Sequence, residues 1–333
     1  MVDLNSFSLL ALWSATVLYA LALIAFSLDL ARRSSEVKEA SAAQSAVATS
    51  AEQSVAQAGG GVAVKTRPVK PQSSEPAVTA KRSPSLRSAM ALMVLGFLLH
   101  VAADVTRGIA AERVPWANLY EFVMTGTMLV VAVFLVVNIK VDLRYLGTFI
   151  SLLVVSLLCM GTINFYVEVA PLPPALQSAW LVIHVFLATT AMGFLALGCA
   201  LSVLQLIQAR TEARRAALGE LKLKFMATFP SAQRLENLAY RTIIVGFVLW
   251  TFTLIAGSIW AEAAWGRYWG WDTKEVWTFI IWVIYAGYIH ARATKGWRGS
   301  RAAWLAIIGF GTVIFNFTVV NIFFNGLHSY SGL

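Results

Sequence analysis

Long apolar runs separated by short polar stretches repeat along this chain. A helix needs about 20 apolar residues to cross the hydrocarbon core of a bilayer, and eight runs have roughly that length. They cover 7–29, 88–108, 118–139, 145–166, 178–208, 240–261, 274–294 and 301–323. The pattern predicts an all-α fold, a polytopic membrane helix bundle with about eight transmembrane helices.

The stretch 30–87 interrupts this pattern. It is rich in Ala, Ser, Gln, Gly and Pro, with almost no aromatic or large aliphatic side chains, so it cannot bury enough apolar surface to order itself. The first apolar run lacks a basic n-region and a small-residue cleavage site, which indicates an anchor and not a removable signal peptide. We therefore predict an N-terminal transmembrane anchor (1–29), a flexible low-complexity cytoplasmic linker (30–87) and a transmembrane core (88–333).

Composition supports the membrane assignment. The chain is 58% hydrophobic and 13% charged, with a mean hydropathy of +0.69, whereas soluble domains carry about 25% charged residues. Cys159 and Cys199 both lie in apolar runs and form no C-x-x-C pair, so we expect small buried hydrophobes and no thiol chemistry. The stretch 209–238 mixes charge with Leu and Phe, which fits either an amphipathic surface helix or an extension of the fifth run.

The net charge of +9 reflects topology. Of the 26 Lys and Arg residues, 22 fall in four alternate polar stretches, at 30–87, 138–144, 209–241 and 291–301. Cytoplasmic loops carry such an excess, so we expect no nucleic-acid site. We predict a multi-pass protein of the cell membrane, or of the thylakoid membrane in a plastid. Both termini and the loops 109–117, 167–177 and 262–273 then lie on the outer side.

The last of these outer loops leads into Trp265–Trp277, which reads WGRYWGWDTKEVW. It holds four of the twelve tryptophans in thirteen residues. Tryptophan gathers at bilayer interfaces because its ring is amphipathic, and an interfacial belt is the ordinary explanation. The density of tryptophan, with two glycines and four charged residues between the rings, favours a flat aromatic platform that binds a ligand.

The chain has only four histidines. His184, near the outer end of its run, and His328, just past the last run, fall on the same side as the tryptophan-rich loop, whereas His100 and His290 lie within apolar runs. A hydrogen-bonded structural histidine is the alternative for each. Polar groups inside a membrane are costly and usually functional, and neutral imidazole binds haem iron. We predict an external pair, His184 and His328, and an intramembrane pair, His100 and His290.

The tryptophan-rich stretch resembles the WWD signature of haem-handling proteins in cytochrome c maturation, and more narrowly the CcsA/ResC family (named CcsB in some bacteria). The matching positions are Trp265, Gly266, Tyr268, Trp269, Trp271, Asp272, Lys274 and Glu275. Thr273 stands where proline is common in the family. VPWANLYEF at 114–122 and GLHSY at 326–330 also look like family motifs, so the resemblance covers 88–333.

The resemblance implies a b-type haem, held non-covalently and in transit. Its iron would be bound by His184 and His328 outside and by His100 and His290 within the membrane. Trp265, Trp269 and Trp271 would form the platform, and Asp272 would fix the loop. Arg267, Arg107 and Arg113 are candidates for pairing with the propionates because guanidinium pairs well with carboxylates, and interfacial snorkelling is the alternative for each. The implied partners are a CcsB/ResB-type membrane protein and an apocytochrome c with a C-x-x-C-H segment.

The function that follows is the haem-attachment step of cytochrome c maturation. The chain would be the haem-presenting subunit of a holocytochrome-c synthase complex that forms thioether bonds, with no catalytic residue assigned beyond presentation. A haem transporter that passes haem on without ligation, and a b-haem electron-transfer subunit, are the alternatives. Covalent product with a C-x-x-C-H partner separates the first from the second, and redox cycling with quinol would indicate the third. The sequence assigns no role to Glu121.

Overall fold

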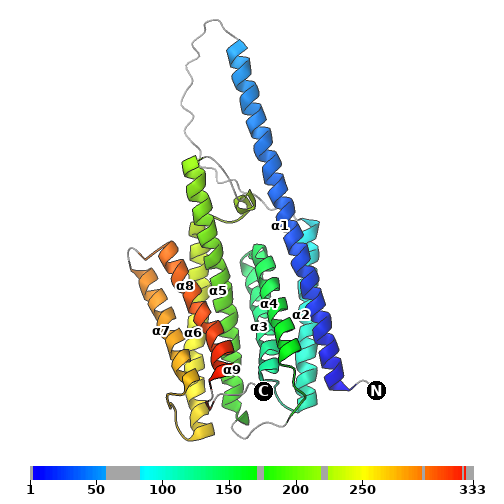
Figure 1. Cartoon of the computed structure of the whole chain (residues 1–333), viewed down its shortest axis with the longest axis vertical. Coiled ribbons are helices and arrows are strands. Elements are labelled where there is room, and N and C mark those ends of the chain that lie inside the picture. Colours follow the sequence, from blue (N-terminus) through cyan, green and yellow to red (C-terminus); the bar gives the residue numbers. More distant parts are fainter. Residues whose placement is uncertain are drawn as a thin grey trace.

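The computed structural model is all-helical and describes residues 3–57, 83–170, 176–218, 224–294, 297–324 and 326–327. Eight long helices follow one another: α1 Leu4–Gln57, α2 Pro84–Ala111, α3 Leu119–Lys140, α4 Gly147–Asn164, α5 Ala179–Leu218, α6 Ala232–Trp265, α7 Thr273–Ala293 and α8 Ser300–Phe315 (Figure 1). Short helical turns are η1 Arg144–Leu146, η3 Lys224–Thr228, the π-helical η4 Asn316–Val320 and α9 Asn321–Phe323. Each apolar run therefore forms a helix, and the predicted all-α bundle is confirmed.

Seven helices of the described part are long and apolar enough to cross a membrane. The long helix that is absent from this set is α7, because it carries Trp, Tyr, His and charged residues among its aliphatic ones. Tryptophan and tyrosine residues along the helix and a buried charge near each end reduce the hydropathy of α7 without shortening it. Its 21 residues remain enough for a span.

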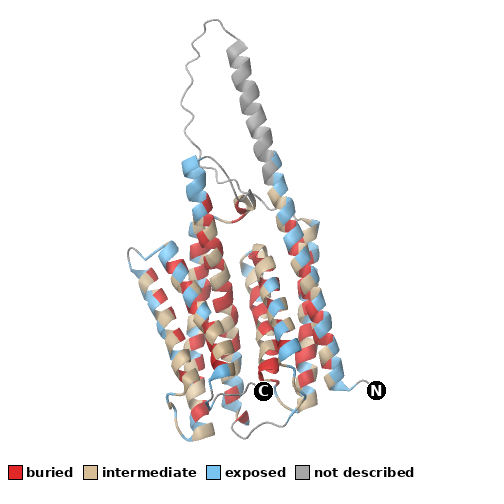
Figure 2. Cartoon of the chain, viewed as in Figure 1, coloured by how far each residue is buried: buried red, intermediate tan, exposed pale blue. Residues whose placement is uncertain are grey.

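The helices form two groups that share α5. One apolar core joins α1, α2, α3 and α4 to one face of α5 and to the first turns of α6, and a second core joins another face of α5 to α6, α7 and α8. The two groups lie side by side, with buried residues concentrated along α5 (Figure 2). Because α5 belongs to both cores, it fixes the position of the first group relative to the second.

One end of the bundle gathers the parts that the charge pattern places together. The start of α1, the α6–α7 connection and α9 all lie at the lower end in Figure 1. Helix α6 stops at Gly266, whose φ of +68° is left-handed, and α7 begins after Asp272. The tryptophan-rich loop therefore spans the gap between two helix ends, and we call this end of the bundle the loop end.

The structure differs from expectation at the first connection. Helix α1 continues to Gln57, through the first part of the stretch predicted to be a linker. Alanine, glutamate, glutamine and lysine favour helix even without a core to pack against, and that composition prevails here. Residues 58–82 lie outside the described part, so the three-part division of the chain stays a prediction. Helix α5 likewise extends to Leu218. For residues 209–218 this favours an extension of the fifth helix over a separate surface helix.

Candidate functional site: an aromatic cavity at the loop end

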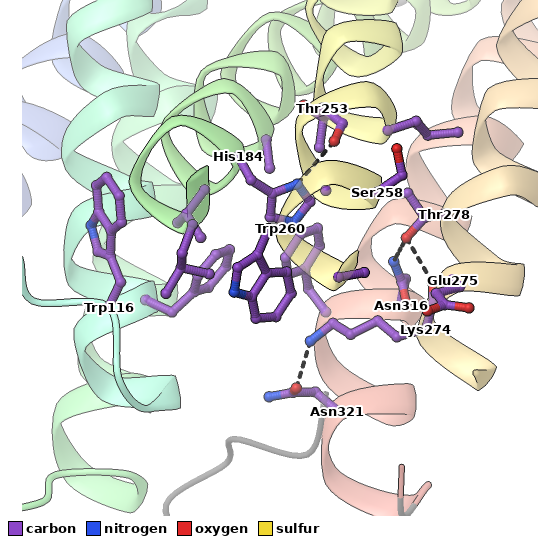
Figure 3. A pocket seen from close by; sticks show the side chains of 18 of the residues that line it. Trp116, His184, Thr253, Ser258, Trp260, Lys274, Glu275, Thr278, Asn316 and Asn321 are labelled. Atoms are coloured by element: carbon purple, nitrogen blue, oxygen red, sulfur yellow. Dashed lines mark hydrogen bonds between the residues drawn. The ribbon is translucent and has the colours of Figure 1, made fainter. Parts of the chain in front are cut away.

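A cavity lies directly beneath the tryptophan-rich loop. It holds ≈ 1060 Å³ of empty space, its open mouth included, and draws its wall from both helix groups. The connection before α3 contributes Trp116, α5 contributes His184, and α6 contributes Trp260 (Figure 3). The remaining wall comes from the loop itself, from the start of α7 and from η4 and α9. Segments far apart in the sequence thus converge on one space.

His184 is held in a defined orientation inside this cavity. Its Nδ1 lies 2.9 Å from the backbone oxygen of Thr253 on α6 (Figure 3). A carbonyl oxygen only accepts, so Nδ1 carries the proton and Nε2 is the basic nitrogen of the neutral ring. Histidines that bind metals are commonly oriented by this kind of bond. The imidazole also stacks on Trp260, with centroids 5.8 Å apart and planes at 22°.

The ring of His184 fits against α6 because residue 257 is glycine. A Cβ added to Gly257 would lie 2.6 Å from both Nδ1 and Cε1 of the imidazole. That separation is shorter than any ordinary contact, so a larger residue would have to displace the ring. Gly257 therefore belongs to the seat of the histidine, although it contributes no side chain.

The tryptophans of the loop do not form one flat platform. Trp269 lines the cavity, whereas Trp265 packs edge-on behind Trp260, with ring centroids 4.8 Å apart. Trp271 stands perpendicular to Trp269 and is 75% exposed. Its φ of +61° is left-handed, a costly conformation for a bulky residue. The structure thus distributes the three predicted rings among the cavity wall, the layer behind it and the outer surface.

Glu275 and Asp272 hold the loop in place. The Oε2 atom of Glu275 accepts hydrogen bonds from the backbone N–H groups of Gly270 (2.8 Å) and Asp272 (3.1 Å), within the capping box that starts α7. The Oδ1 atom of Asp272 accepts from the backbone N–H of Leu327 at 3.2 Å. Asp272 therefore joins the loop to the residue that immediately precedes His328. His328 itself lies outside the described residues.

The two cations near the loop, Arg267 and Lys274, differ in their position relative to the cavity. Arg267 lies over Gly270, where a Cβ would overlap its guanidinium group, and it does not line the cavity. Lys274 does line the cavity. Its Nζ donates to Oδ1 of Asn321 at 2.6 Å and lies 5.7 Å from the centre of the Phe317 ring. The structure gives no support to Arg267 as a cavity cation.

Glu121 has a structural role that the sequence did not reveal. It is fully buried and forms ion pairs with Arg107 (3.0 Å) and Arg113 (2.7 Å). It also accepts a hydrogen bond from the backbone N–H of Ala117 at 2.9 Å, next to the cavity residue Trp116. Both guanidinium groups predicted to meet propionates are therefore engaged with Glu121. The cluster fixes the connection that forms one wall of the cavity.

The structure does not bring His100 and His290 together. His100 is fully buried on α2 and lies 3.3 Å from the hydroxyl of Tyr19 on α1. His290 is exposed, near the end of α7. Helices α2 and α7 lie on opposite sides of the bundle (Figure 1), because each packs within a different helix group. A shared iron between these two side chains remains a prediction that this arrangement does not support.

Several cavity residues were absent from the predicted site. Trp116 and Lys274 lie in the family-like motifs but had no assigned role, and Trp260 had none either. On α6, a signal was present: cavity-lining residues recur every three or four positions, which marks one helix face. These residues are Trp250, Thr253, Leu254, Gly257, Ser258, Trp260 and Ala261.

Together, the helical bundle and its cavity define a multi-pass membrane protein with a histidine-bearing aromatic site at one end. Residues 116–328 match the family described as Cytochrome C assembly protein. Curated relatives are named cytochrome c biogenesis protein CcsA. One from Guillardia theta is 39% identical over 245 residues, covering 68% of this chain and 80% of the relative. The chain belongs to the CcsA family of cytochrome c biogenesis proteins and has that family's role in cytochrome c maturation.

Relatives from other organisms carry the same name. The CcsA of Prochlorococcus marinus is 36% identical over 252 residues, covering 68% of this chain and 78% of the relative. The CcsA of Chlorella vulgaris is 32% identical over 255 residues, covering 69% of this chain and 81% of the relative. The family match spans every element that lines the cavity, from Trp116 to Asn321.

Proposed function

We propose that this protein binds haem as a substrate in the loop-end cavity and presents it for attachment to apocytochrome c. The observation that carries the proposal is the seat of His184. Its ring is held by Thr253, stacked on Trp260 and placed inside an aromatic cavity. A neutral imidazole with Nε2 as its basic nitrogen is the form that binds haem iron.

The cavity has the size and chemistry for such a substrate. It opens at the loop end and is lined mostly by apolar and aromatic side chains with a few polar groups, as ligand pockets usually are. Trp116, Trp269 and Phe122 supply aromatic surface from three different segments. Haem is flat and apolar over most of its area, so stacking and burial against these rings would stabilise it.

His328 is the proposed second external ligand. Asp272 binds the backbone N–H of Leu327, so the segment leading to His328 is attached to the loop above the cavity. His100 and His290 are kept as proposed intramembrane ligands. Since they lie on different sides of the bundle, they would act at separate positions along the route of haem to the loop end.

The attachment reaction would take place at the outer face. Each cysteine S–H of an apocytochrome C-x-x-C-H segment adds across one vinyl C=C, forming one C–S and one C–H bond, so atoms and electrons balance without an oxidant. The residues of this chain would hold haem and fix its orientation, which supplies rate by proximity. A CcsB/ResB-type membrane protein is the proposed partner, and the loop end is proposed to face outward.

An absorption spectrum of the detergent-purified protein tests the proposal, recorded beside His184→Ala and His328→Ala. We expect a reducible six-coordinate haem spectrum in the parent, altered or lost in either variant. Asp142→Asn, an exposed change on the α3–α4 connection, serves as the control. A parent that carries no haem, even with its partner chain, would refute haem binding.

Co-expression with a C-x-x-C-H reporter separates attachment from simple delivery. Covalent haem on the reporter, lost in His184→Ala, supports presentation for ligation. Haem binding without any covalent product would instead favour a delivery protein.

A further inference from the structure

A half-buried cation in the cavity, Lys274, forms no ion pair within 4 Å among the described residues. Lys274 lines the cavity at the first turn of α7. Its polar contact is the neutral amide oxygen of Asn321, at 2.6 Å. A cation removed from water is costly unless an anion or several dipoles compensate it. The cavity therefore favours an anionic group beside Lys274.

The neighbouring carboxylates do not fill this role. Glu275 directs Oε2 to the backbone N–H groups of Gly270 and Asp272, and Asp272 accepts from the backbone of Leu327. Both acidic side chains shape the loop, and Glu275 also lines the cavity, where its Oε1 accepts no hydrogen bond from the described residues. Neither comes within ion-pair distance of Lys274. The positive charge remains available to a group that enters the cavity.

Asn321 makes the surroundings of the Lys274 ammonium group suitable for binding a carboxylate. It is 8% exposed and lines the same cavity. Because its Oδ1 accepts from Lys274, its Nδ2 is the donor end of the amide, and Figure 3 shows Asn321 and Lys274 meeting on the same side of the cavity. An ammonium group and an amide N–H next to each other match the two oxygens of one carboxylate. The adjoining Phe317 ring adds an apolar surface beside the ammonium group.

We propose that Lys274 and Asn321 form a subsite that binds a carboxylate of the substrate in this cavity. This rests on the proposed function, where that carboxylate is a haem propionate. The subsite would direct the propionate edge toward α7 and α9. The vinyl-bearing half of the ring would then face the opposite wall, where Figure 3 places Trp116.

The test compares two porphyrin substrates with and without free carboxylates. Detergent-purified protein stripped of haem is titrated with haem and with haem dimethyl ester, and dissociation constants are read from the absorption change. The variants are Lys274→Met, which keeps the length of the side chain without its charge, and Lys274→Arg, which keeps the charge. The matched control is Lys140→Met, which changes an exposed lysine at the last residue of α3, whereas the first turn of α3 lines the cavity.

We expect the parent to prefer haem over the ester by about tenfold or more, as for a charge-assisted hydrogen-bonded pair. Lys274→Met should lose that preference by weakening haem binding alone, Lys274→Arg should keep most of it, and Lys140→Met should match the parent. Equal binding of haem and ester by the parent overturns the subsite. So does a Lys274→Met variant that weakens both ligands equally.

The outcomes separate this subsite from the proposed function. Binding that depends on His184 but not on free carboxylates rejects the subsite and leaves the haem site intact. If neither porphyrin binds the parent, both proposals fail.

Discussion

The two predicted histidine pairs meet very different surroundings. At the loop end, His184 is seated by Thr253, Gly257 and Trp260 in a cavity built by both helix groups. In the bundle, His100 and His290 lie on separate sides. His100 is buried with no hydrogen bond to Nε2 from the described residues, whereas His290 is exposed.

The difference shows what makes a histidine a site. Each of the four is a polar group in an apolar sequence, and each attracts the same functional prediction. Only His184, among the histidines that the structure describes, also has an orienting hydrogen bond to a carbonyl, an aromatic partner and adjoining space. Among the described residues, His184 has surroundings that suit a ligand, whereas His100 and His290 lie on helices at opposite sides of the bundle.

The largest expected effect tests the scaffold on which the loop end depends. Glu121→Ala leaves Arg107 fully buried without its carboxylate partner and should lower the free energy of unfolding by about 3–5 kcal/mol. Thermal unfolding in detergent measures it. Glu168→Ala, at an exposed position, should change stability by less than about 0.5 kcal/mol. Similar melting of the two variants would show that the buried cluster does not support this end.

A smaller effect isolates the seat of His184. Gly257→Ala should push the imidazole away from Thr253 and weaken haem binding about 10–100-fold, the usual cost of losing a partner that orients a ligand. Gly287→Ala on α7 is the matched control, since a Cβ there meets nothing within 4 Å. Spectral titration of both variants gives the comparison. Unchanged affinity in Gly257→Ala would contradict the assigned orientation.

The smallest effect separates the tryptophans of the loop. Trp271→Gly relieves the left-handed backbone at φ +61° and should raise the free energy of unfolding by about 1 kcal/mol. Because this ring is 75% exposed, haem affinity should stay within about twofold, a change of only a few tenths of a kcal/mol. Trp271→Ala keeps the Cβ and should give no gain in stability. A large loss of affinity would place Trp271 in the haem site.

Much of the fold could be predicted because its cause is local. Apolar length alone locates all eight long helices, and the Lys and Arg distribution groups the loops that the structure gathers at one end. The continuation of α1 to Gln57 does not follow from hydrophobicity, which is low there, but agrees with the high helix propensity of alanine.

The site could be predicted only in part because contacts between distant segments decide it. Sequence placed His184 and the tryptophan-rich loop on one side, and in the structure both line the same cavity. It could not show that Trp271 points outward, that Lys274 and not Arg267 faces the cavity, or that Glu121 engages both arginines. Each of these depends on packing across helices, which periodicity along one helix does not encode.

The order in which the cavity wall appears along the chain has a consequence for biosynthesis. Trp116 is made early, whereas Asn316 and Asn321 come from η4 and α9, some two hundred residues later. A chain still emerging from the ribosome, or one truncated before η4, has its cavity open on the side of Lys274. Incomplete chains would thus lack part of the cavity wall, which is complete only when the last helical segments are in place.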